Sequence, residues 1–325
     1  MGLSSGSSNF LLTVSARDTR LVELADVMDP EQNKWKAFTA EHPISLPYEE
    51  DRTFAPPTAA TRIAKGAIPP QVVRELDRRK RFYTQIIAAS VDLYKMDIED
   101  ARAIGGAPEK YLAKIQNVIP ESFQIWRNQV AAAALVYSVP GSTIPANLSP
   151  YLDVYTADGF TWFYSAHTYS SSAQTYSNVP GSDLSNNVDA LTEMDLIFKA
   201  IRQPTGYPTV IRSRKIVSDP TLVPGWKVVL QSDFEVTTAN NALNKAQFLI
   251  KGTELVEWEW LPNNFYVMFA DTGDDYKLQH VVRQKMEVET EYLPSTGRRV
   301  WYARSRENFQ APIMGFDAIP SVAGI

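Results

Sequence analysis

The three histidines are the first residues to consider for metal binding or proton transfer. His42, His167 and His280 lie far apart in the sequence, no His-Glu-x-x-His pair occurs, and the chain has no cysteine. A zinc site normally needs several such ligands at short and regular spacing. We therefore predict no metal site and no cofactor site, and we interpret each histidine as a hydrogen-bonded loop or surface residue.

Two glutamates that alternate with two tryptophans could form a catalytic pair. In Glu257-Trp258-Glu259-Trp260, an extended strand would place both carboxylates on one face and both indoles on the other. A glycosidase cleft could use such a pair. Because any antiparallel strand with one buried face shows the same alternation, we favour that simpler interpretation. No Gly-rich phosphate loop and no Gly-x-Ser-x-Gly motif occurs, so we predict no catalytic residue and no enzyme activity.

Two further polar segments could make contacts without doing chemistry. The basic run Arg78-Arg79-Lys80-Arg81 could touch nucleic acid or an acidic neighbour. We interpret it first as a solvated face and second as a contact with a neighbouring subunit. The Ser, Thr and Tyr residues between Thr168 and Ser177 could form a ligand loop or a modification target, but we interpret them as an exposed, adaptable polar loop.

The composition is that of a folded protein with few special features. The chain has 325 residues, of which 44% are hydrophobic and 21% charged, and its net charge is -5. This balance predicts a substantial core and disfavours general DNA binding, which normally uses a basic surface. Disulfides are excluded because cysteine is absent. The N-terminus has no signal-peptide or myristoylation pattern, and the longest apolar run, Val130 to Val139, is too short to span a bilayer, so we expect no membrane segment.

The first 80 residues are typical of extended chain. Residues 1–30 are rich in Gly, Ser and Asn around one apolar patch, Phe10 to Val14, and indicate an arm that becomes ordered only against another surface. A frayed terminus would explain the composition equally well. Residues 31–80 carry six prolines between Pro43 and Pro70, too many for a helix or a central strand. We predict a long extended loop there.

Residues 81–139 combine a strand with a long helix. Val91 to Ile98 alternate between apolar and polar residues as a half-buried strand does, whereas Phe82 to Ile87 could instead continue a helix from Gln71. Apolar side chains then recur at helical spacing from Ala107 to Tyr137. We predict a long helix over this range, kinked or split at Pro120.

The remaining sequence predicts a second lobe at 140–211 and a β-rich return at 212–325, which gives an α+β fold class. Asp183-Leu184-Ser185 offers a cap region for the helix that follows it. The expected helices are Val188 to Arg202 and Thr237 to Leu249. The expected strands are Phe160 to Tyr164, Val210 to Val217, Gly225 to Leu230, Glu254 to Leu261, Phe265 to Ala270, Leu278 to Tyr292 and Arg299 to Phe309.

Three segments, taken in order, resemble the major head subunit of phage Mu and its prophage relatives. Leu93 to Asp100 is similar to the strand that closes with an Ile-Glu-Asp-Asp type sequence before the long helix of that family. Asp158 to His167, followed by Ser177-Asn178 and Leu184-Ser185, is similar to its Asp-Gly, Phe-Ser, His, Ser-Asn, Leu-Ser series. Asn264 to Asp271 resembles its aromatic strand that ends in Asp.

The resemblance implies the Hong Kong 97 capsid fold and the function of a tailed-bacteriophage major capsid protein. In that fold we expect an N-terminal arm at 1–30, an extended E-loop region at 31–80, the strand and spine helix of a peripheral lobe at 81–139, an axial lobe at 140–211, and a β-rich segment at 212–325 that completes both lobes. The resemblance also implies self-assembly, in the cytoplasm of the host bacterium, into hexamers and pentamers of an icosahedral or prolate virion shell. The implied partners are scaffolding, portal and decoration proteins, with double-stranded DNA enclosed but not bound sequence-specifically.

Two alternatives remain open on the sequence alone. An encapsulin-like shell would use the same fold to hold enzymes instead of DNA, and only the cargo would separate these two functions. A carbohydrate-binding or glycan-active protein would require a concave site rich in tryptophan and paired carboxylates.

Overall fold

The structure is a computed structural model that describes most of the chain between residues 30 and 322. The described residues are 30–54, 76–94, 108–170, 173–202, 211, 213–231, 253–270, 273–293 and 297–322. Several predictions therefore lie wholly or partly outside the described residues: the arm before Pro30, the part of the loop at 55–75, the second half of the strand predicted at Val91 to Ile98, and the helix from Thr237 to Leu249.

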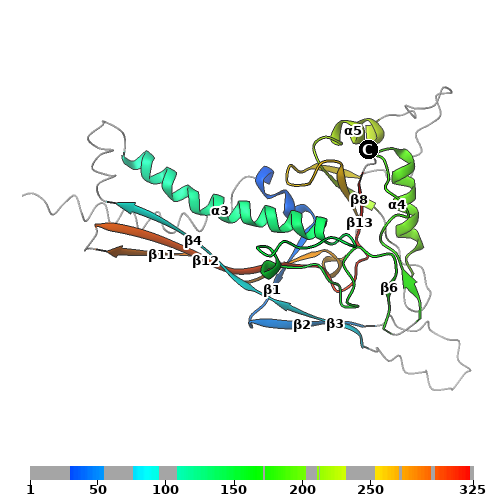
Figure 1. Cartoon of the computed structure of the whole chain (residues 1–325), viewed down its shortest axis with the longest axis horizontal. Coiled ribbons are helices and arrows are strands. Elements are labelled where there is room, and N and C mark those ends of the chain that lie inside the picture. The colour runs from blue at the N-terminus through cyan, green and yellow to red at the C-terminus, as the bar shows by residue number, and fades with distance from the viewer. Residues whose placement is uncertain are drawn as a thin grey trace, which may run out of the picture.

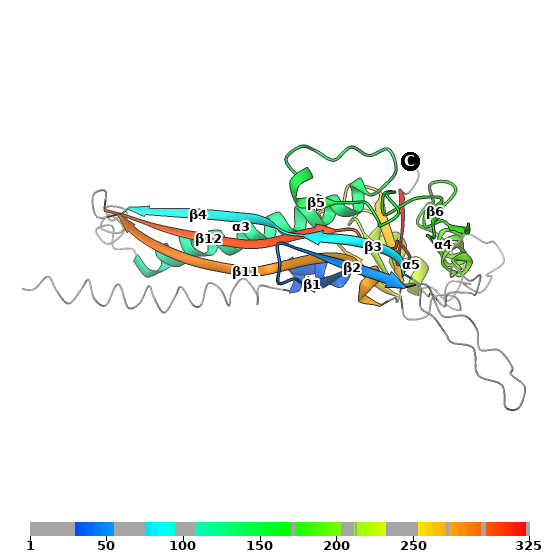
Figure 2. The same ribbon diagram turned by 90° about the horizontal axis from the view of Figure 1, so that it is seen from below.

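The molecule is elongated, with a thin limb at one end and a broader body at the other (Figures 1 and 2). In the limb, one long helix lies along three long strands. The body contains two shorter helices and a second sheet. The limb elements are α3 (Pro108–Tyr137), β4 (Gln85–Tyr94), β11 (Leu278–Leu293) and β12 (Arg298–Gln310). Helices and strands occur together without regular alternation along the chain, so the predicted α+β class is confirmed.

The limb is built on a five-stranded sheet whose strands come from distant parts of the chain. The order is β1 (Thr39–Pro43), β11, β12 and β4, and β5 (Leu152–Asp153) runs parallel to the end of β12. β12 is antiparallel to both of its long neighbours. β1 pairs only with the first residues of β11, from Leu278 to Val282. The two long strands predicted near the C-terminus are therefore confirmed to within one residue at each end.

Alternation along β12 decides which face of the limb sheet packs against α3. Trp301 and Ala303 are buried in one core cluster with Ile119 and Phe123 of α3, which Ile87 and Met286 complete. Tyr302, between them, points to the opposite face and is exposed. A period of two is expected when only one face of an antiparallel sheet is covered. The hydrophobic core of the limb therefore lies only between α3 and one face of the sheet.

Helix α3 is continuous over 30 residues, a length of about 45 Å. Pro120 lies inside the helix without ending it. The predicted long helix is therefore confirmed, and a split at Pro120 is wrong. The helix continues because a proline removes only one backbone hydrogen bond. From Val130 to Leu135 every side chain is buried, because this part of the helix enters a second core with Trp162, Trp258 and Phe309. An apolar surface all round is typical of an enclosed helix.

The body is organised around β10 (Phe265–Ala270), whose six side chains are all buried. The sheet order is β13 (Ala318–Val322), β10, β8 (Ser213–Ser218) and β9 (Glu254–Glu257). Phe265, Val267 and Phe269 join the core around α3, whereas Tyr266 and Met268 join the core around the two body helices. The strand predicted from this aromatic run is confirmed, and its position between two cores explains why it is apolar on both faces.

Of the two body helices, α4 was predicted from the sequence and α5 was not. α4 (Val188–Ala200) is confirmed, and its cap is Asn187, whose side chain accepts a hydrogen bond from the Ala190 N–H, two residues after the predicted Ser185. α5 (Val223–Gln231) replaces the strand predicted at 225–230. Pro224 is tolerated in the first helical turn, and the Trp226 ring packs 4.9 Å from that of Tyr266. Tertiary packing therefore overrides the strand preference of the β-branched residues.

Two short ribbons complete the fold. β2 (Tyr48–Phe54) and β3 (Leu76–Tyr83) pair antiparallel, and β6 (His167–Thr168) pairs with β7 (Thr175–Tyr176). Part of the predicted loop at 31–80 is therefore paired strand, and the optional helix through Phe82 is wrong. The described residues also include 3₁₀-helical segments at η1 (Pro30–Ala37), which is interrupted at Asn33, and single 3₁₀ turns at η2 (Ser149–Tyr151) and η3 (Asp274–Tyr276).

The strand predicted at 160–164 is also wrong. Thr161 alone forms an isolated bridge, with Tyr155, within irregular chain. The neighbouring side chains of Trp162 and Phe163 pack in the core instead. Both are fully buried, and their rings are stacked.

Candidate assembly interface

A buried lysine ties the β2–β3 ribbon to the rest of the molecule. Lys80 of β3 is only 7% exposed. Its Nζ donates to the carbonyl oxygen of Ala311 at 2.7 Å and to that of Tyr155, and Asp153 Oδ2 lies 3.4 Å away. Burial lowers the pKa of Lys80, and the Asp153 charge opposes that change. The base of the ribbon is thus fixed to two separate segments, 153–155 and the chain after β12.

The other members of the basic run divide between the two faces of the same strand. The Arg78 guanidinium donates to the carbonyl and hydroxyl oxygens of Thr168, at 2.8 and 3.0 Å. Arg79 and Arg81 are exposed, and the Arg81 guanidinium lies 4.6 Å from the centre of the Tyr48 ring. The predicted solvated face is therefore wrong for Arg78 and Lys80, because a strand turns alternate side chains to opposite sides.

A second ionic cluster joins α3 to the base of the limb sheet. Arg127 Nε donates to Glu307 Oε2 at 3.0 Å and its Nη2 donates to Oε1 at 3.1 Å. His280 Nε2 lies 2.7 Å from Oε2, and Ser305 Oγ donates to Oε1 at 2.7 Å. Burial would raise the pKa of Glu307, but the Arg127 charge and the His280 hydrogen bond lower it to about 2. The helix is therefore held to two strands by one carboxylate, which makes four hydrogen bonds with three partner residues.

A third network closes the irregular segment between β5 and β7. His167 Nδ1 lies 2.8 Å from Asp158 Oδ2, and its Nε2 lies 3.0 Å from the Trp162 carbonyl oxygen. Asn178 Nδ2 donates to the carbonyl oxygens of Trp162 and Gly315. A Cβ atom at Gly315 would lie 2.7 Å from that same Trp162 oxygen, so a side chain there would push the segment away. Burial raises the pKa of Asp158, but hydrogen bonds from His167 and Thr156 lower it to about 2.

Two of the three histidines are therefore structural and buried. His167 and His280 both have carboxylate partners, which agrees with the predicted hydrogen bonding but not with a surface position. Across the described ranges, no group of three or more His, Asp or Glu side chains is arranged to hold a metal ion. No helix in the described part of the chain combines the length and apolar character needed to cross a bilayer.

The Glu-Trp repeat lacks the predicted alternating geometry. β9 ends at Glu257, and the residues after it form a turn. Trp258 is buried and its Nε1 donates to Asn128 Oδ1 at 3.3 Å, whereas Trp260 is 38% exposed. Glu259 pairs with Lys34 of η1 at 2.9 Å. The prediction that both indoles share one face is therefore wrong.

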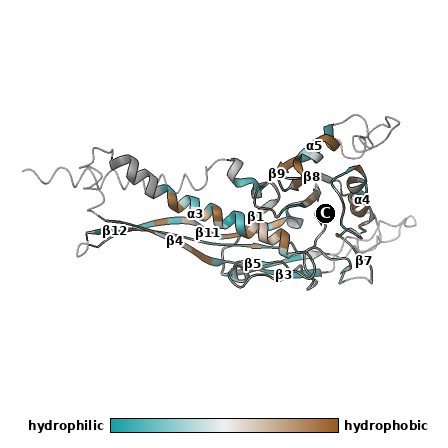
Figure 3. Ribbon diagram, turned by 45° about the horizontal axis from the view of Figure 1, so that its top comes forward, coloured by the Kyte–Doolittle hydropathy of each residue, from teal (hydrophilic) through white to brown (hydrophobic). Residues whose placement is uncertain are grey.

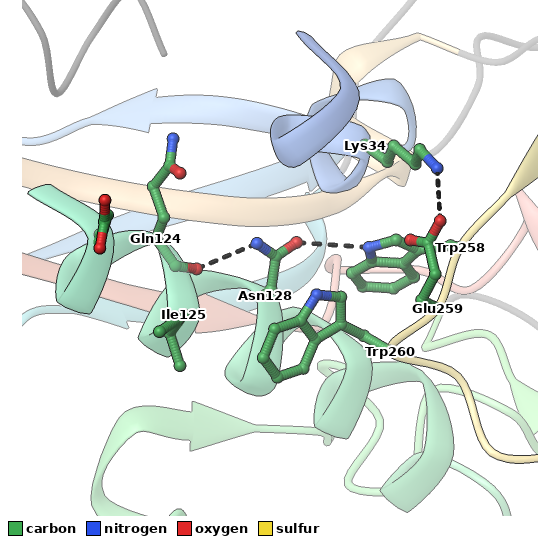
Figure 4. A pocket seen from close by; sticks show the side chains of 8 residues that line it. Lys34, Gln124, Ile125, Asn128, Trp258, Glu259 and Trp260 are labelled. Atoms are coloured by element: carbon green, nitrogen blue, oxygen red, sulfur yellow. Dashed lines mark hydrogen bonds and ion pairs between the residues drawn. The ribbon is translucent and has the colours of Figure 1, made fainter. Parts of the chain in front are cut away.

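The same turn forms one wall of an open pocket of about 430 Å³, whose other walls are η1 and α3 (Figure 4). Ile125 and Trp260 lie on the same side of α3 in this view. The Lys34–Glu259 ion pair lies at the opposite end of the pocket from Ile125. The lining residues are Lys34, Glu121, Gln124, Ile125, Asn128, Trp258, Glu259 and Trp260. The pocket thus combines exposed apolar surface with amide and carboxylate groups.

Other exposed apolar side chains lie on elements of both the limb and the body, and hydrophobic residues occur along the ribbon of both parts (Figure 3). The exposed side chains include Leu46, Tyr48, Ile86, Tyr94, Tyr155, Leu196, Val228, Tyr292 and Tyr302. Single exposed apolar residues are normal on any protein, so none of them marks a site by itself. Ile125 and Trp260 differ because they border one concave surface.

The Ser/Thr/Tyr-rich segment is less exposed than predicted. Tyr169 and Tyr176 are buried beside Phe316, and the Tyr176 hydroxyl accepts a hydrogen bond from the Gly315 N–H at 3.1 Å. The tyrosines therefore belong to the core of the body, and the interpretation as an adaptable loop is wrong for them.

Comparison with solved structures identifies the architecture. The head structure of Helicobacter pylori bacteriophage KHP40 aligns with a TM-score of 0.54 at 7% identity, covering 87% of each chain. The capsid of the cyanophage P-SCSP1u aligns with a TM-score of 0.54 at 11% identity, covering 88% of this chain and 86% of that one. The chain has a phage-capsid fold. The capsid of a native GTA particle aligns over 92% of both chains with a TM-score of 0.53 at 13% identity.

No family model matches the sequence, and no curated protein matches it. At these identities the phage-capsid fold is what the similarity establishes, and the expected likeness to phage Mu heads stays a prediction. The ionic clusters at Lys80 and Glu307 were not found from the sequence. Asp153 and Ala311 lie 73 and 231 residues from Lys80, and Arg127 lies 180 residues from Glu307, so no sequence spacing marks these pairs.

Proposed function

We propose that this chain is the major capsid protein of a tailed bacteriophage, which assembles into a closed shell around double-stranded DNA. The observation that carries the proposal is the similarity to phage capsid subunits over about nine-tenths of both chains. A match of this extent includes the limb and the body together. It leaves little of the chain for an added catalytic domain.

The geometry of the described residues supports a structural role rather than an enzymatic one. Three of the buried titratable groups hold elements together: Lys80 anchors a ribbon, Glu307 anchors α3, and Asp158 closes a loop. The elongated form exposes a large surface to neighbours (Figure 1). Many weak contacts between identical copies add up to a stable shell. A net charge of -5 would also leave enclosed DNA free to move.

In this proposal the parts of the chain take the following roles. Residues 1–30 form an arm, 31–80 an extended loop that contains the β2–β3 ribbon, and 81–139 the strand and helix of the peripheral lobe. Residues 140–211 form the axial lobe, and 212–325 complete both lobes. Copies associate as hexamers and pentamers in the host cytoplasm and end in the virion, with scaffolding, portal and decoration proteins as partners. The three sequence motifs favour the phage Mu group.

Electron microscopy of the purified recombinant chain tests the proposal. We expect closed particles tens of nanometres across, or open capsomers that close when a scaffolding protein is supplied. Particles that package only a protein cargo in the native host would refute the DNA-enclosing function while retaining the shell. A chain that stays monomeric at every concentration, with and without scaffold, would refute the proposal altogether.

A further inference from the structure

The segment between β12 and β13 leads from the limb sheet to the body sheet, and we call residues 311–317 the crossing segment. Every residue of it is buried. The Ile313 carbonyl oxygen accepts a hydrogen bond from the Ala157 N–H at 3.0 Å, and the Asp317 carbonyl oxygen accepts one from the Ala270 N–H of β10 at 2.7 Å. The crossing segment therefore connects the limb, the irregular segment after β5 and the body sheet.

The last residue of the crossing segment carries a buried carboxyl group without a polar partner. Asp317 is 0% exposed, and neither of its side-chain oxygens has a hydrogen-bond partner within the described residues. The Trp162 indole N–H is buried and unpaired in the same part of the chain. By contrast, Asp158 and Glu307 both have side-chain partners at hydrogen-bonding distance. Asp317 therefore lacks the compensation that the other two carboxylates have.

A carboxyl group in such a position keeps its proton, because an ionised carboxylate without a partner is far more costly to bury than the neutral acid. Burial raises the pKa of Asp317 well above its ordinary value, and the Trp162 indole and the Lys277 charge oppose this effect only in part. Lys277, just before β11, already pairs with Asp274 at 2.7 Å. β10 contacts Asp317 through the backbone N–H of Ala270, which carries no charge.

We propose that the crossing segment is a proton-controlled latch between the limb and the body. While Asp317 carries its proton, the segment stays packed; when the carboxyl ionises, it must reach water, and the backbone hydrogen bonds of the segment open with it. Phe316 and Ala318, on either side of Asp317, belong to different hydrophobic cores, so the opening loosens both. This inference goes beyond the proposed function, because the latch is a property of the single chain.

Urea unfolding of the unassembled full-length chain between pH 4 and pH 9 tests the role of the proton. In the unfolded chain Asp317 ionises near its ordinary pKa of 3.8, whereas the folded chain keeps the proton to higher pH. Its stabilisation is therefore complete at low pH and is lost as the pH rises. Relative to Asp317→Asn, the unfolding constant of the natural chain should increase about tenfold per pH unit above pH 5, until the folded pKa is reached.

Asp274→Asn is the matched control, because Asp274 is a carboxylate beside the same lysine but its side chain is 78% exposed. The unfolding constants of this variant and the natural chain should keep a fixed ratio between pH 5 and pH 9. A fixed ratio for Asp317→Asn as well would overturn the proposal. Asp317→Leu, which is similar in shape and cannot ionise, should show the same pH dependence as Asp317→Asn and replaces it if the asparagine variant does not fold.

Amide hydrogen exchange shows where the molecule opens. In the natural chain, the protection factors of the Ala157 and Ala270 N–H groups should fall more steeply from pH 5 to pH 9 than those of the β4–β12 pair in the limb. In Asp317→Asn the two sets should change in parallel. Equal loss of protection in both sets of the natural chain would show that ionisation unfolds the whole molecule, and unchanged protection would show that no latch opens. Either result would overturn the proposal, even if neither variant folds.

Discussion

For the ionic cluster at Glu307, both the size of a stability change and the direction of its pH dependence can be predicted. We consider the substitution Glu307→Gln, which keeps the shape of the side chain and removes its charge. The carboxylate now accepts four hydrogen bonds, from Arg127 twice, from Ser305 and from His280. The glutamine amide can accept at its oxygen only, and its NH₂ group would face donors. Arg127 would also remain buried without its counter-charge.

The magnitude follows from the pKa of Glu307. A fall from the ordinary value of 4.5 to about 2 corresponds to about 3 kcal/mol of folding free energy at neutral pH. Breaking one side of a buried ion pair costs about 3–5 kcal/mol in other proteins. We therefore expect Glu307→Gln to lower the free energy of unfolding by about 3 kcal/mol at pH 7.

The pH dependence provides a second check. Because the folded state lowers the pKa of Glu307, its stabilisation is present above pH 4.5 and is lost as the pH falls toward about 2. The variant has no carboxylate to protonate at this position. The difference in stability between the natural chain and the variant should therefore be constant above pH 5 and shrink between pH 4.5 and pH 2.

Urea unfolding of the unassembled full-length chain, followed by tryptophan fluorescence, measures these differences. The control is Glu289→Gln on the limb, where the Arg304–Glu289 pair is more than half exposed on both sides and should contribute no more than about 1 kcal/mol. If the two variants lose the same stability at pH 7, or if the Glu307→Gln difference does not change between pH 5 and pH 2.5, our account of the cluster is incorrect.

Two further substitutions probe the ribbon and the limb core. Lys80→Met leaves the carbonyls of Tyr155 and Ala311 without a donor; we expect a loss of about 1–3 kcal/mol and faster amide hydrogen exchange in β2 and β3. Arg79→Met on the exposed face should change neither quantity, and equal effects would contradict the anchoring role. Trp301→Ala should cost about 3–5 kcal/mol through the cavity it leaves under α3. Tyr302→Ala, one residue away on the open face, should cost less than about 1 kcal/mol in the same urea titration, and a reversed order would show that the burial is misassigned.

Local patterns were sufficient for the long elements. Helix α3 and strands β10, β11 and β12 were predicted because their apolar spacing reflects which faces are covered, and that spacing is visible in consecutive residues. The failures occurred where distant residues decide. Trp226 is drawn into the core beside Tyr266, which converts a valine-rich segment into helix α5.

The basic run shows why the ionic contacts inside the molecule were harder to predict. Four consecutive charges suggest a solvated face, but once they lie in a strand, alternate ones must point inward. Lys80 can do so because two carbonyls and Asp153 converge on it from segments more than 70 residues away. The Arg127–Glu307 pair is separated by 180 residues. No property of either residue's own neighbourhood in the sequence indicates its partner.

The pairing between β11 and β12 is irregular at one place, between Val282 and Glu287, where the register shifts twice. On one side of this place the strands are buried on both faces, and on the other they rest on a single helix. β-Bulges bend a strand locally and reduce its pairing. β11 is therefore bent between the base of the limb and its outer half, whereas β12 keeps an unbroken register with β4. If the chain forms the shell proposed above, we expect copies at five-fold and six-fold positions to differ in their bend at this place.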